Sequence, residues 1–361
     1  MKGPSEPIRV GLLGYGYSGK VFHAPLIAAV PGLRLCGVSS RAAASVRADY
    51  PSAKVYADPL ALITAHEIDL IVIATPNDTH APLARAAIAA GKHVVIDKPF
   101  TLDLAEARDL VALSVLRGVL LSVFHNRRWD SDYLTVRRAI DDGLVGTVSQ
   151  FESHFDRFRP EVRDRWRERA GAGSGVWFDL GPHLVDQAVQ ILGIPDRVEA
   201  SLAMQRSGAK TDDWAHVILF HAKQRAILHA GMLVAGGTNR FTVHGDAGSI
   251  VKRSSDRQEA QLLEGMLPGA PGWGEDPDAL LVYHGEGGGG EGAARQIPSV
   301  AGDQRRYYQG IVDAVRGAGP NPVPSVQALC VMAIMEAAVQ SSRSRASVDV
   351  SLTQEERRAW Q

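Results

Sequence analysis

The first third of the chain alternates short apolar runs with segments of helical spacing. Consecutive apolar positions, typical of strands buried on both faces, occur at 8–12, 33–38, 70–74, 93–96 and 120–124. Between them, apolar positions spaced three and four apart predict helices at 42–49, 59–66, 79–90 and 104–117. Strands that alternate with helices predict an α/β domain over residues 1–124, with the doubly wound parallel sheet of the Rossmann fold.

The pattern of predicted helices and strands changes after residue 124. Helices are expected near 130–141, 179–192 and 325–341, and strands at 147–157, 197–205, 215–220, 226–233, 241–243 and 346–351. Because few helices separate these strands, residues 125–361 are predicted to form an α+β domain with a mainly antiparallel sheet. The glycine-rich segment 285–292 is interpreted as a flexible loop tip without chemistry.

Composition excludes several partners. With 45% hydrophobic residues among 361, each half is able to bury a core, and 39 basic against 40 acidic residues give no field that attracts nucleic acid or an anionic membrane. The two cysteines, Cys36 and Cys330, match no disulfide framework or metal spacing, so no metal is expected. The polar start at Met1–Pro7 lacks the features of a signal peptide, and no apolar run reaches the ~20 residues of a membrane span. We therefore expect a cytoplasmic protein.

A glycine fingerprint follows the first predicted strand. Its residues are Gly14, Tyr15, Gly16, Tyr17, Ser18 and Gly19. In this position the first glycine allows a tight turn, the second allows the backbone to approach a pyrophosphate, and the third allows close helix packing. The motif predicts dinucleotide binding. Because Pro25 falls inside the expected helix, we predict that this helix breaks near His23, which either stabilises the break or touches ligand.

The end of the second strand indicates which dinucleotide is bound. NAD enzymes usually carry an acidic residue there for the ribose 2′-hydroxyl, whereas this chain has Ser39, Ser40 and Arg41. Hydroxyls followed by an arginine suit a 2′-phosphate, so NADP(H) is expected in preference to NAD(H), which stays possible. A capped helix start at Ser39 or Ser40 is compatible with that role.

Two further turns follow the fourth and fifth strands. The first contains Thr75, Pro76, Asn77 and His80, and the second contains Asp97, Lys98 and Pro99. Both lie at the carboxyl edge of the predicted sheet, where open α/β sheets bind ligands, so these residues are expected to line the cofactor site. Lys98 could also donate to a substrate oxygen and stabilise negative charge on it, and a solvated surface lysine is the alternative.

In the second half, Asp179 and His183 stand four residues apart at a predicted helix start, hence on one face. A carboxylate can orient a histidine and stabilise its protonated form, so that the histidine acts as a general base for a hydroxyl proton. The alternative is that Asp179 caps the helix, Pro182 lies in its first turn, and His183 packs in the interior. On the strand at 147–157, alternation places Asp156 on a polar face opposite Phe155.

These motifs together resemble the glucose-fructose oxidoreductase, inositol dehydrogenase and MocA family, whose members share the glycine fingerprint, a TPN turn, an EKP-type lysine and a DxGxH helix. Asp97 stands where the family usually has glutamate. The strings at 14–25, 125–130 and 165–168 look like the branch that contains NADP-dependent scyllo-inositol dehydrogenases.

The resemblance implies an oxidoreductase that transfers a hydride between NADP(H) and a CH–OH or C=O carbon of a cyclitol or sugar. It carries the family's catalytic lysine, aspartate and histidine to Lys98, Asp179 and His183, and suggests Arg127 and Trp166 as substrate contacts, with a surface ion pair as the alternative for Arg127. The polar face of the strand at 147–157 suggests Asp156 as a further substrate contact. It also implies that the second sheet is open on one face and forms a homodimer or homotetramer. An aldose dehydrogenase, an anhydro-sugar ketone reductase and a non-catalytic NADP-sensing protein are the alternatives.

Overall fold

The computed structural model describes residues 6–284 and 294–360, so the predicted loop tip at 285–292 lies outside the described residues. The chain divides into two compact units. Unit 1 comprises residues 1–126, 258–273 and 303–329, and unit 2 comprises 127–257, 274–302 and 330–361. Two segments that follow the predicted boundary at residue 124 therefore pack into unit 1.

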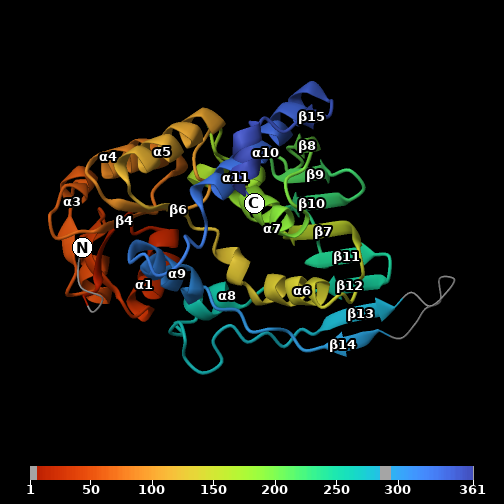
Figure 1. Cartoon of the computed structure of the whole chain (residues 1–361), viewed down its shortest axis with the longest axis horizontal. Coiled ribbons are helices and arrows are strands. Elements are labelled where there is room, and N and C mark those ends of the chain that lie inside the picture. The colour runs from red at the N-terminus through yellow and green to blue at the C-terminus, as the bar shows by residue number, and fades with distance from the viewer. Residues whose placement is uncertain (1–5, 285–293, 361) are drawn as a thin grey trace. The chain divides into compact units, whose positions relative to one another are not determined.

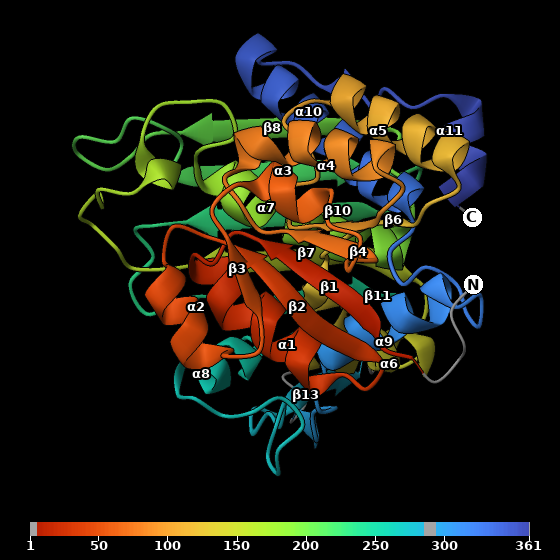
Figure 2. The same cartoon turned by 90° about the vertical axis from the view of Figure 1, so that its left-hand side faces the viewer.

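Unit 1 contains a six-stranded parallel sheet in the order β3-β2-β1-β4-β5-β6 (Figure 2). Its strands are β1 (Ile8–Leu13), β2 (Leu33–Ser39), β3 (Lys54–Tyr56), β4 (Leu70–Ile73), β5 (His93–Ile96) and β6 (Leu121–Val123). This topology confirms the predicted Rossmann fold and its five apolar strands. The short β3 was missed because its three residues are half-buried or exposed and form no apolar run.

The helices of unit 1 pack in two groups. Helix α1 contacts α9, and α4 contacts α3 and α5. Their bounds are α1 (Ala24–Ala29), α2 (Ala43–Asp49), α3 (Pro59–Ile63), α4 (His80–Ala89), α5 (Leu104–Arg117), α8 (Gln258–Leu263) and α9 (Arg305–Val315). The last two come from the segments that return to this unit late in the chain.

The predicted break near His23 is a change of helix type, and the chain stays helical through it. Residues Gly19–His23 form a π-helix that continues into α1 with helical dihedral angles at His23. Pro25 lies in the first turn of α1, where its missing N–H leaves no hydrogen bond unmade. The proline is therefore accommodated by a change of helix type, and π-turns of this kind are frequent at functional sites.

Unit 2 contains a nine-stranded sheet in the order β14-β13-β12-β11-β7-β10-β9-β8-β15 (Figure 1). Its strands are β7 (Val148–Asp156), β8 (Arg197–Ala203), β9 (Trp214–Phe220), β10 (Arg225–Gly231), β11 (Phe241–Gly245), β12 (Gly248–Lys252), β13 (Leu280–His284), β14 (Arg295–Ile297) and β15 (Val348–Asp349). Among these pairs only β7 and β10 run parallel, which confirms a mainly antiparallel sheet.

Helices of unit 2 cover one face of this sheet. Helix α7 (Val176–Leu192) packs against β7, β9 and β10, and α6 (Ser131–Asp141) packs against β12. Helix α10 (Ser325–Ser344) joins the two units in sequence, and α11 (Gln354–Trp360) follows it. No helix of the described residues is long and apolar enough to cross a membrane.

Helix α7 begins three residues before its predicted start. Gly175 is the N-cap residue, with φ of 96°, so Asp179 lies one turn into the helix and Pro182 lies in its interior. The interpretation of Asp179 as the cap is therefore wrong. The cap is supplied by a distant loop, in which the Asp212 carboxylate accepts from the backbone N–H of Trp177 at 2.8 Å. Such a partner has no local sequence signal.

Candidate functional site

The glycine loop has the steric properties that a dinucleotide requires. Gly14 has φ of 93°, and a Cβ there would overlap the Ala74 carbonyl oxygen. A Cβ at Gly19 would overlap the Gly14 carbonyl oxygen, whereas the space around Gly16 is open. The loop thus turns tightly, packs closely at its third glycine, and leaves the backbone at its second glycine accessible to a ligand.

Side chains around the glycine loop are held by ion pairs and hydrogen bonds. Tyr15 is buried and donates to Asp49 Oδ2 at 2.8 Å, and Lys20 Nζ lies 2.9 Å from the same oxygen. These two bonds lower the pKa of Asp49, the bond from Lys20 being the larger cause. Tyr17 is exposed and donates to Glu259 of α8 at 2.8 Å, so a late segment of the chain reaches the loop.

The three polar residues at the end of β2 become more exposed along the chain, from the buried Ser39 to the exposed Arg41. Ser39 is buried, and its carbonyl accepts from Gly14 N at 2.9 Å, which fixes the loop on the strand. Ser40 Oγ accepts from Ala42 N at 3.0 Å, and Arg41 is exposed. The serine therefore supports a turn before α2, because α2 begins at Ala43 without a side-chain cap. No acid occupies this strand end.

The turns after β4 and β5 are joined by a buried histidine. His80 Nδ1 lies 2.8 Å from the Pro99 carbonyl and Nε2 lies 3.0 Å from the Thr75 carbonyl. Burial lowers the pKa of His80, and a neutral ring donates to only one of these two carbonyls. Asn77 is buried and Pro76 is exposed in the short 3₁₀ turn that precedes α4. The structure thus places His80 between the turns.

Asp97 and Lys98 differ in their surroundings. The Asp97 carboxylate is buried, and its Oδ1 accepts from the backbone N–H of Lys98 at 2.7 Å. Lys98 is half-buried, and the Lys98–Pro99 peptide bond is cis. The turn therefore presents the lysine at the carboxyl edge of the sheet while its acidic neighbour points into the protein.

Close helix packing requires the glycine of the DxGxH segment. A Cβ at Gly181 would lie 2.7 Å from Trp177 Cε3 and 2.9 Å from Met335 Sδ of α10. The Trp177 indole, which is fully buried, donates to the Met335 carbonyl at 3.2 Å. Glycine at this position lets α7 and α10 approach closely, and that contact fixes the part of α7 that carries Asp179 and His183.

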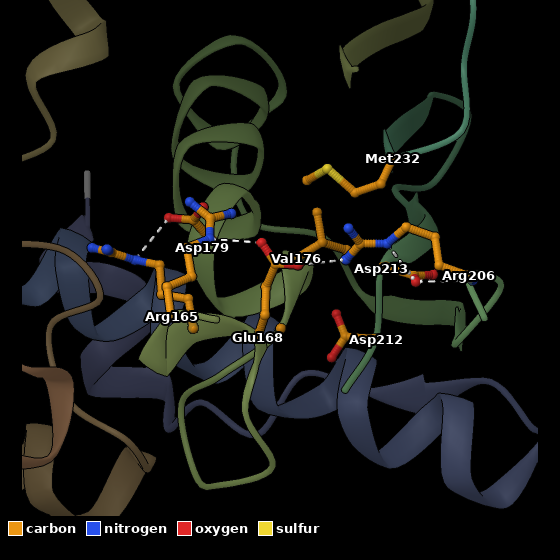
Figure 3. A pocket seen from close by; sticks show the side chains of 10 residues that line it. Arg165, Glu168, Val176, Asp179, Arg206, Asp212, Asp213 and Met232 are labelled. Carbon is orange, nitrogen blue, oxygen red and sulfur yellow. Dashed lines mark hydrogen bonds and ion pairs between the residues drawn. The ribbon is translucent and has the colours of Figure 1, made fainter. Parts of the chain in front are cut away.

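A small pocket of about 10 Å³, room for about one water molecule, lies beside Asp179 in unit 2. Figure 3 shows charged side chains from the loop before α7 and from the segment at 206–213 converging around it. Its lining residues are Arg165, Arg167, Glu168, Gly175, Val176, Asp179, Arg206, Asp212, Asp213 and Met232. Its acidic and basic walls offer both acceptors and donors of hydrogen bonds to a small polar group such as one hydroxyl.

Ion pairs hold the side chains that line this pocket. Arg167 Nε lies 3.3 Å from Asp179 Oδ1, and the guanidinium stacks on Trp166 at 4.5 Å from the ring centroid. Glu168 accepts from Arg165 Nε at 2.7 Å and from Arg206 Nη2 at 3.0 Å. Although burial raises the pKa of Glu168, these contacts and a backbone N–H lower it overall. Trp166 thus supports Arg167, and Glu168 anchors the loop.

His183 is buried on α7, and its ring lies 6.4 Å from that of Phe155 on β7. Arg127 contacts the same Phe155 ring, because its guanidinium lies 4.9 Å from the ring centroid. The guanidinium also donates to Asp130 at 2.9 Å. The structure therefore brings Arg127 and His183 to the same aromatic ring, on the face of the sheet that α7 covers.

Asp156 lies on the opposite face. Burial along β7 alternates as predicted, so Phe155 faces α7 and Asp156 faces away from it. The Asp156 carboxylate accepts from Thr238 at 2.6 Å and lies 3.4 Å from His154 Nδ1 and 3.5 Å from His229 Nε2. The predicted grouping of Asp156 with Arg127 is not seen, because the alternation of the strand separates them.

Among the described residues, no group of three or more histidine, cysteine or acidic side chains is arranged to hold a metal ion. Arg167, Glu168 and Arg206 were not predicted as functional residues from the sequence. The charged string at 165–168 contains the first two, whereas no motif contains Arg206. Their partners Asp179 and Asp213 lie elsewhere in the chain, so spacing gives no indication of the pairs.

Comparison with known proteins gives the same assignment over nearly the whole chain. Residues 8–125 match the oxidoreductase family's NAD-binding Rossmann fold, and residues 137–350 match its C-terminal alpha/beta domain. The uncharacterized oxidoreductase YdgJ of Escherichia coli is 49% identical over 95% of this chain and 99% of its own. The scyllo-inositol 2-dehydrogenase (NADP(+)) IolW of Bacillus subtilis is 35% identical, covering 95% and 96% of the two chains.

A solved structure agrees with these matches. A Klebsiella pneumoniae protein, provisionally an oxidoreductase, has a crystal structure that superposes with a TM-score of 0.91 at 52% identity, covering 98% of each chain. Both the Rossmann unit and the sheet of unit 2 therefore have the family's architecture. The chain is a member of the glucose-fructose oxidoreductase, inositol dehydrogenase and MocA oxidoreductase family.

Proposed function

We propose that this oxidoreductase transfers a hydride between NADP(H) and a CH–OH or C=O carbon of a cyclitol or sugar, with scyllo-inositol as the first substrate to test. The observation that carries the proposal is the Asp97–Lys98–Pro99 turn at the carboxyl edge of a Rossmann sheet. The full-length match to a scyllo-inositol 2-dehydrogenase (NADP(+)) supports the substrate class.

The cofactor preference rests on the end of β2. Gly14, Gly16 and Gly19 fit a dinucleotide, because the loop turns tightly and leaves Gly16 open. Ser40 and Arg41 offer a hydroxyl and a guanidinium where an acid would repel a 2′-phosphate. When bound, the nicotinamide ring supplies the hydride acceptor in oxidation and the donor in reduction.

In the proposed mechanism three side chains move or stabilise charge. In the direction of oxidation His183 removes the hydroxyl proton as general base, and Lys98 donates to the same oxygen and stabilises its growing negative charge. Asp179, one helical turn from His183, steadies the imidazolium. Reduction reverses each step. Arg127 and Trp166 are proposed to act near the substrate, Arg127 beside the ring of Phe155 and Trp166 through Arg167.

We further propose that the chain forms a homodimer or homotetramer through the face of the unit 2 sheet that α7 does not cover. Half-buried apolar side chains on that face, including Ile218, Ile227 and Val251, support this assignment. Light scattering of the purified protein would determine the number of subunits.

The test is an initial-rate assay of nicotinamide absorbance, with NADP⁺ or NAD⁺, against inositols, aldoses and keto derivatives of both. Turnover of scyllo- or myo-inositol with NADP⁺ and little with NAD⁺ would support the whole proposal. Turnover of aldoses or anhydro-ketones alone would keep the chemistry and replace the substrate. Binding of NADPH without turnover of any of these compounds would favour a sensing protein.

A further inference from the structure

A second buried histidine faces the Asp97–Lys98 turn. His23, the last residue of the π-helix, is completely buried, and its Nδ1 lies 2.6 Å from the hydroxyl of Tyr308 on α9. Its ring also packs on Phe124, with 4.3 Å between the ring centroids. The imidazole is therefore fixed on one side by a hydrogen bond and on its flank by an aromatic ring.

The other ring nitrogen points at Asp97. His23 Nε2 lies 3.7 Å from Asp97 Oδ2 and has no hydrogen-bond partner among the described residues. The second carboxylate oxygen of Asp97 accepts from Lys98 N at 2.7 Å. One buried carboxylate thus lies between the histidine of the glycine-loop helix and the backbone of the lysine proposed to be catalytic.

Neighbouring groups favour the ionised form of this carboxylate in the folded protein. Burial by itself raises the pKa of Asp97, but His23, Lys98 and Ser18 together hold it well below its usual range. A buried carboxylate is costly unless neighbouring groups compensate its charge. Ser18 belongs to the glycine loop, so groups from the loop and from the helix that follows it both stabilise this charge.

Tyr308 favours the tautomer of His23 that carries its proton on Nε2. Burial raises the pKa of Tyr308 well above its ordinary value, so its hydroxyl keeps the proton. When that hydroxyl donates to Nδ1, the ring proton lies on Nε2, which faces the Asp97 carboxylate.

We propose that His23 is a positioning residue for Lys98, because the buried Asp97 carboxylate links its Nε2 to the Lys98 backbone and so couples the glycine-loop helix to the lysine turn. The proposal rests on the proposed catalytic role of Lys98. His80 holds the same turn from the other end through the Pro99 carbonyl. His23 and His80 together fix the backbone on both sides of Lys98.

The first test reads the Lys98 backbone directly and needs no substrate. The chain has few lysines, so protein labelled with [¹⁵N]lysine gives a simple amide spectrum, in which the signal absent from Lys98→Arg is that of Lys98. We expect His23→Leu and Asp97→Asn to shift this signal, His23→Gln to shift it less because its amide restores a donor, and Tyr308→Phe to shift it in the direction of His23→Leu.

His221→Leu is the matched control. His221 is also buried and bonds a backbone carbonyl, Gly193 O, at 3.0 Å, but it lies in unit 2. Its replacement should lower the melting temperature and leave the Lys98 signal in place. An unchanged Lys98 signal in folded His23→Leu would overturn the proposal, whatever the enzyme's activity. If that variant does not fold, the same reading applies to Tyr308→Phe.

The second test uses turnover. We expect His23→Leu to lower kcat ~10-fold to ~100-fold with a small change in the Kd of NADPH, as a misplaced catalytic group does. The double variant His23→Leu with Asp97→Asn should lose no more than Asp97→Asn alone, because both act through one carboxylate. Losses that multiply would contradict the coupling. If the wild-type chain turns over no cyclitol or sugar, the proposed function fails, and the Lys98 signal still decides the role of His23.

Discussion

Arg167 Nε lies 3.3 Å from Asp179 Oδ1, so the carboxylate proposed to steady His183 is itself held by a guanidinium. Because Arg167 also stacks on Trp166, its position is fixed from two sides. The pair leaves the second Asp179 oxygen to other partners, and it keeps a positive charge on the wall of the pocket. The acid of the DxGxH motif therefore depends on the loop before α7 as well as on its helix.

This relationship gives the first prediction. Arg167→Met should lower kcat/KM for the reduced or oxidised substrate ~10-fold to ~100-fold, since Asp179 loses its partner and the pocket loses a hydrogen-bond donor. Initial rates over a range of substrate concentrations measure the effect. Arg169→Met is the control, because Arg169 forms an exposed pair with Asp164 at 2.8 Å in the same loop and exposed pairs contribute little. Equal losses in both variants would assign the effect to the loop as a whole.

Lys98→Met should lower kcat ~100-fold or more and leave the Kd of NADPH within ~3-fold, because the amine acts on the transition state rather than on the cofactor. Cofactor fluorescence gives the Kd and stopped-flow absorbance gives the rate. Lys92→Met is the control. Lys92 precedes β5, at the end of the strand opposite to Lys98, and bonds the carbonyls of Ala65 and Ile68 at 2.9 and 2.8 Å, so its loss should affect stability and not turnover. Loss of NADPH binding in Lys98→Met would contradict the assigned role.

The preference for NADP(H) should depend on Arg41. Arg41→Ala is expected to lower the ratio of kcat/KM for NADP⁺ to that for NAD⁺ ~10-fold or more, because the 2′-phosphate loses a charge-assisted bond. Arg47→Ala removes another exposed arginine from α2 and is expected to leave the ratio unchanged. A ratio that stays constant in Arg41→Ala would place the phosphate elsewhere.

Much of this architecture was predictable because its signals are local. The apolar runs predicted the five Rossmann strands whose residues are mostly buried, and the glycine fingerprint, the Lys98 turn and the DxGxH segment are each contiguous in sequence. What could not be predicted depends on partners far along the chain. Asp212 caps α7, Tyr308 reaches His23, and α8 and α9 return to unit 1. The exposed Lys54 in β3 and the π-helix that precedes Pro25 likewise have no pattern in the sequence to indicate them.

Gly181→Ala should destabilise unit 2 by about 1–3 kcal/mol, the usual cost of an added methyl group in a packed core. A Cβ there would lie 2.7 Å from Trp177 and 2.9 Å from Met335 Sδ, so α7 and α10 must separate. Urea unfolding measures the change in the free energy of unfolding. Gly171→Ala is the control, because nothing lies within 4 Å of a Cβ at that position. Similar changes in both variants would show that the helix contact is not the cause.

The stability of unit 2 should begin to fall at a higher pH than that at which most carboxylates take up protons. Burial lowers the pKa of His216 and of His229 on the uncovered face of the sheet. In the unfolded chain both histidines take up protons near pH ~6.5, whereas in the folded chain they stay neutral to lower pH. The unfolded state therefore binds more protons, and the free energy of unfolding falls as the pH drops below ~6.5.

The variant His216→Asn with His229→Asn should flatten this pH dependence between pH ~7 and ~5, because two of the groups that bind protons only on unfolding are removed. Urea unfolding at several pH values measures the slope. His66→Asn is the control, since His66 is exposed and lies in unit 1. A slope that stays as steep in the double variant would show that other groups, such as the buried His80 or His221, set the acid limit of the fold.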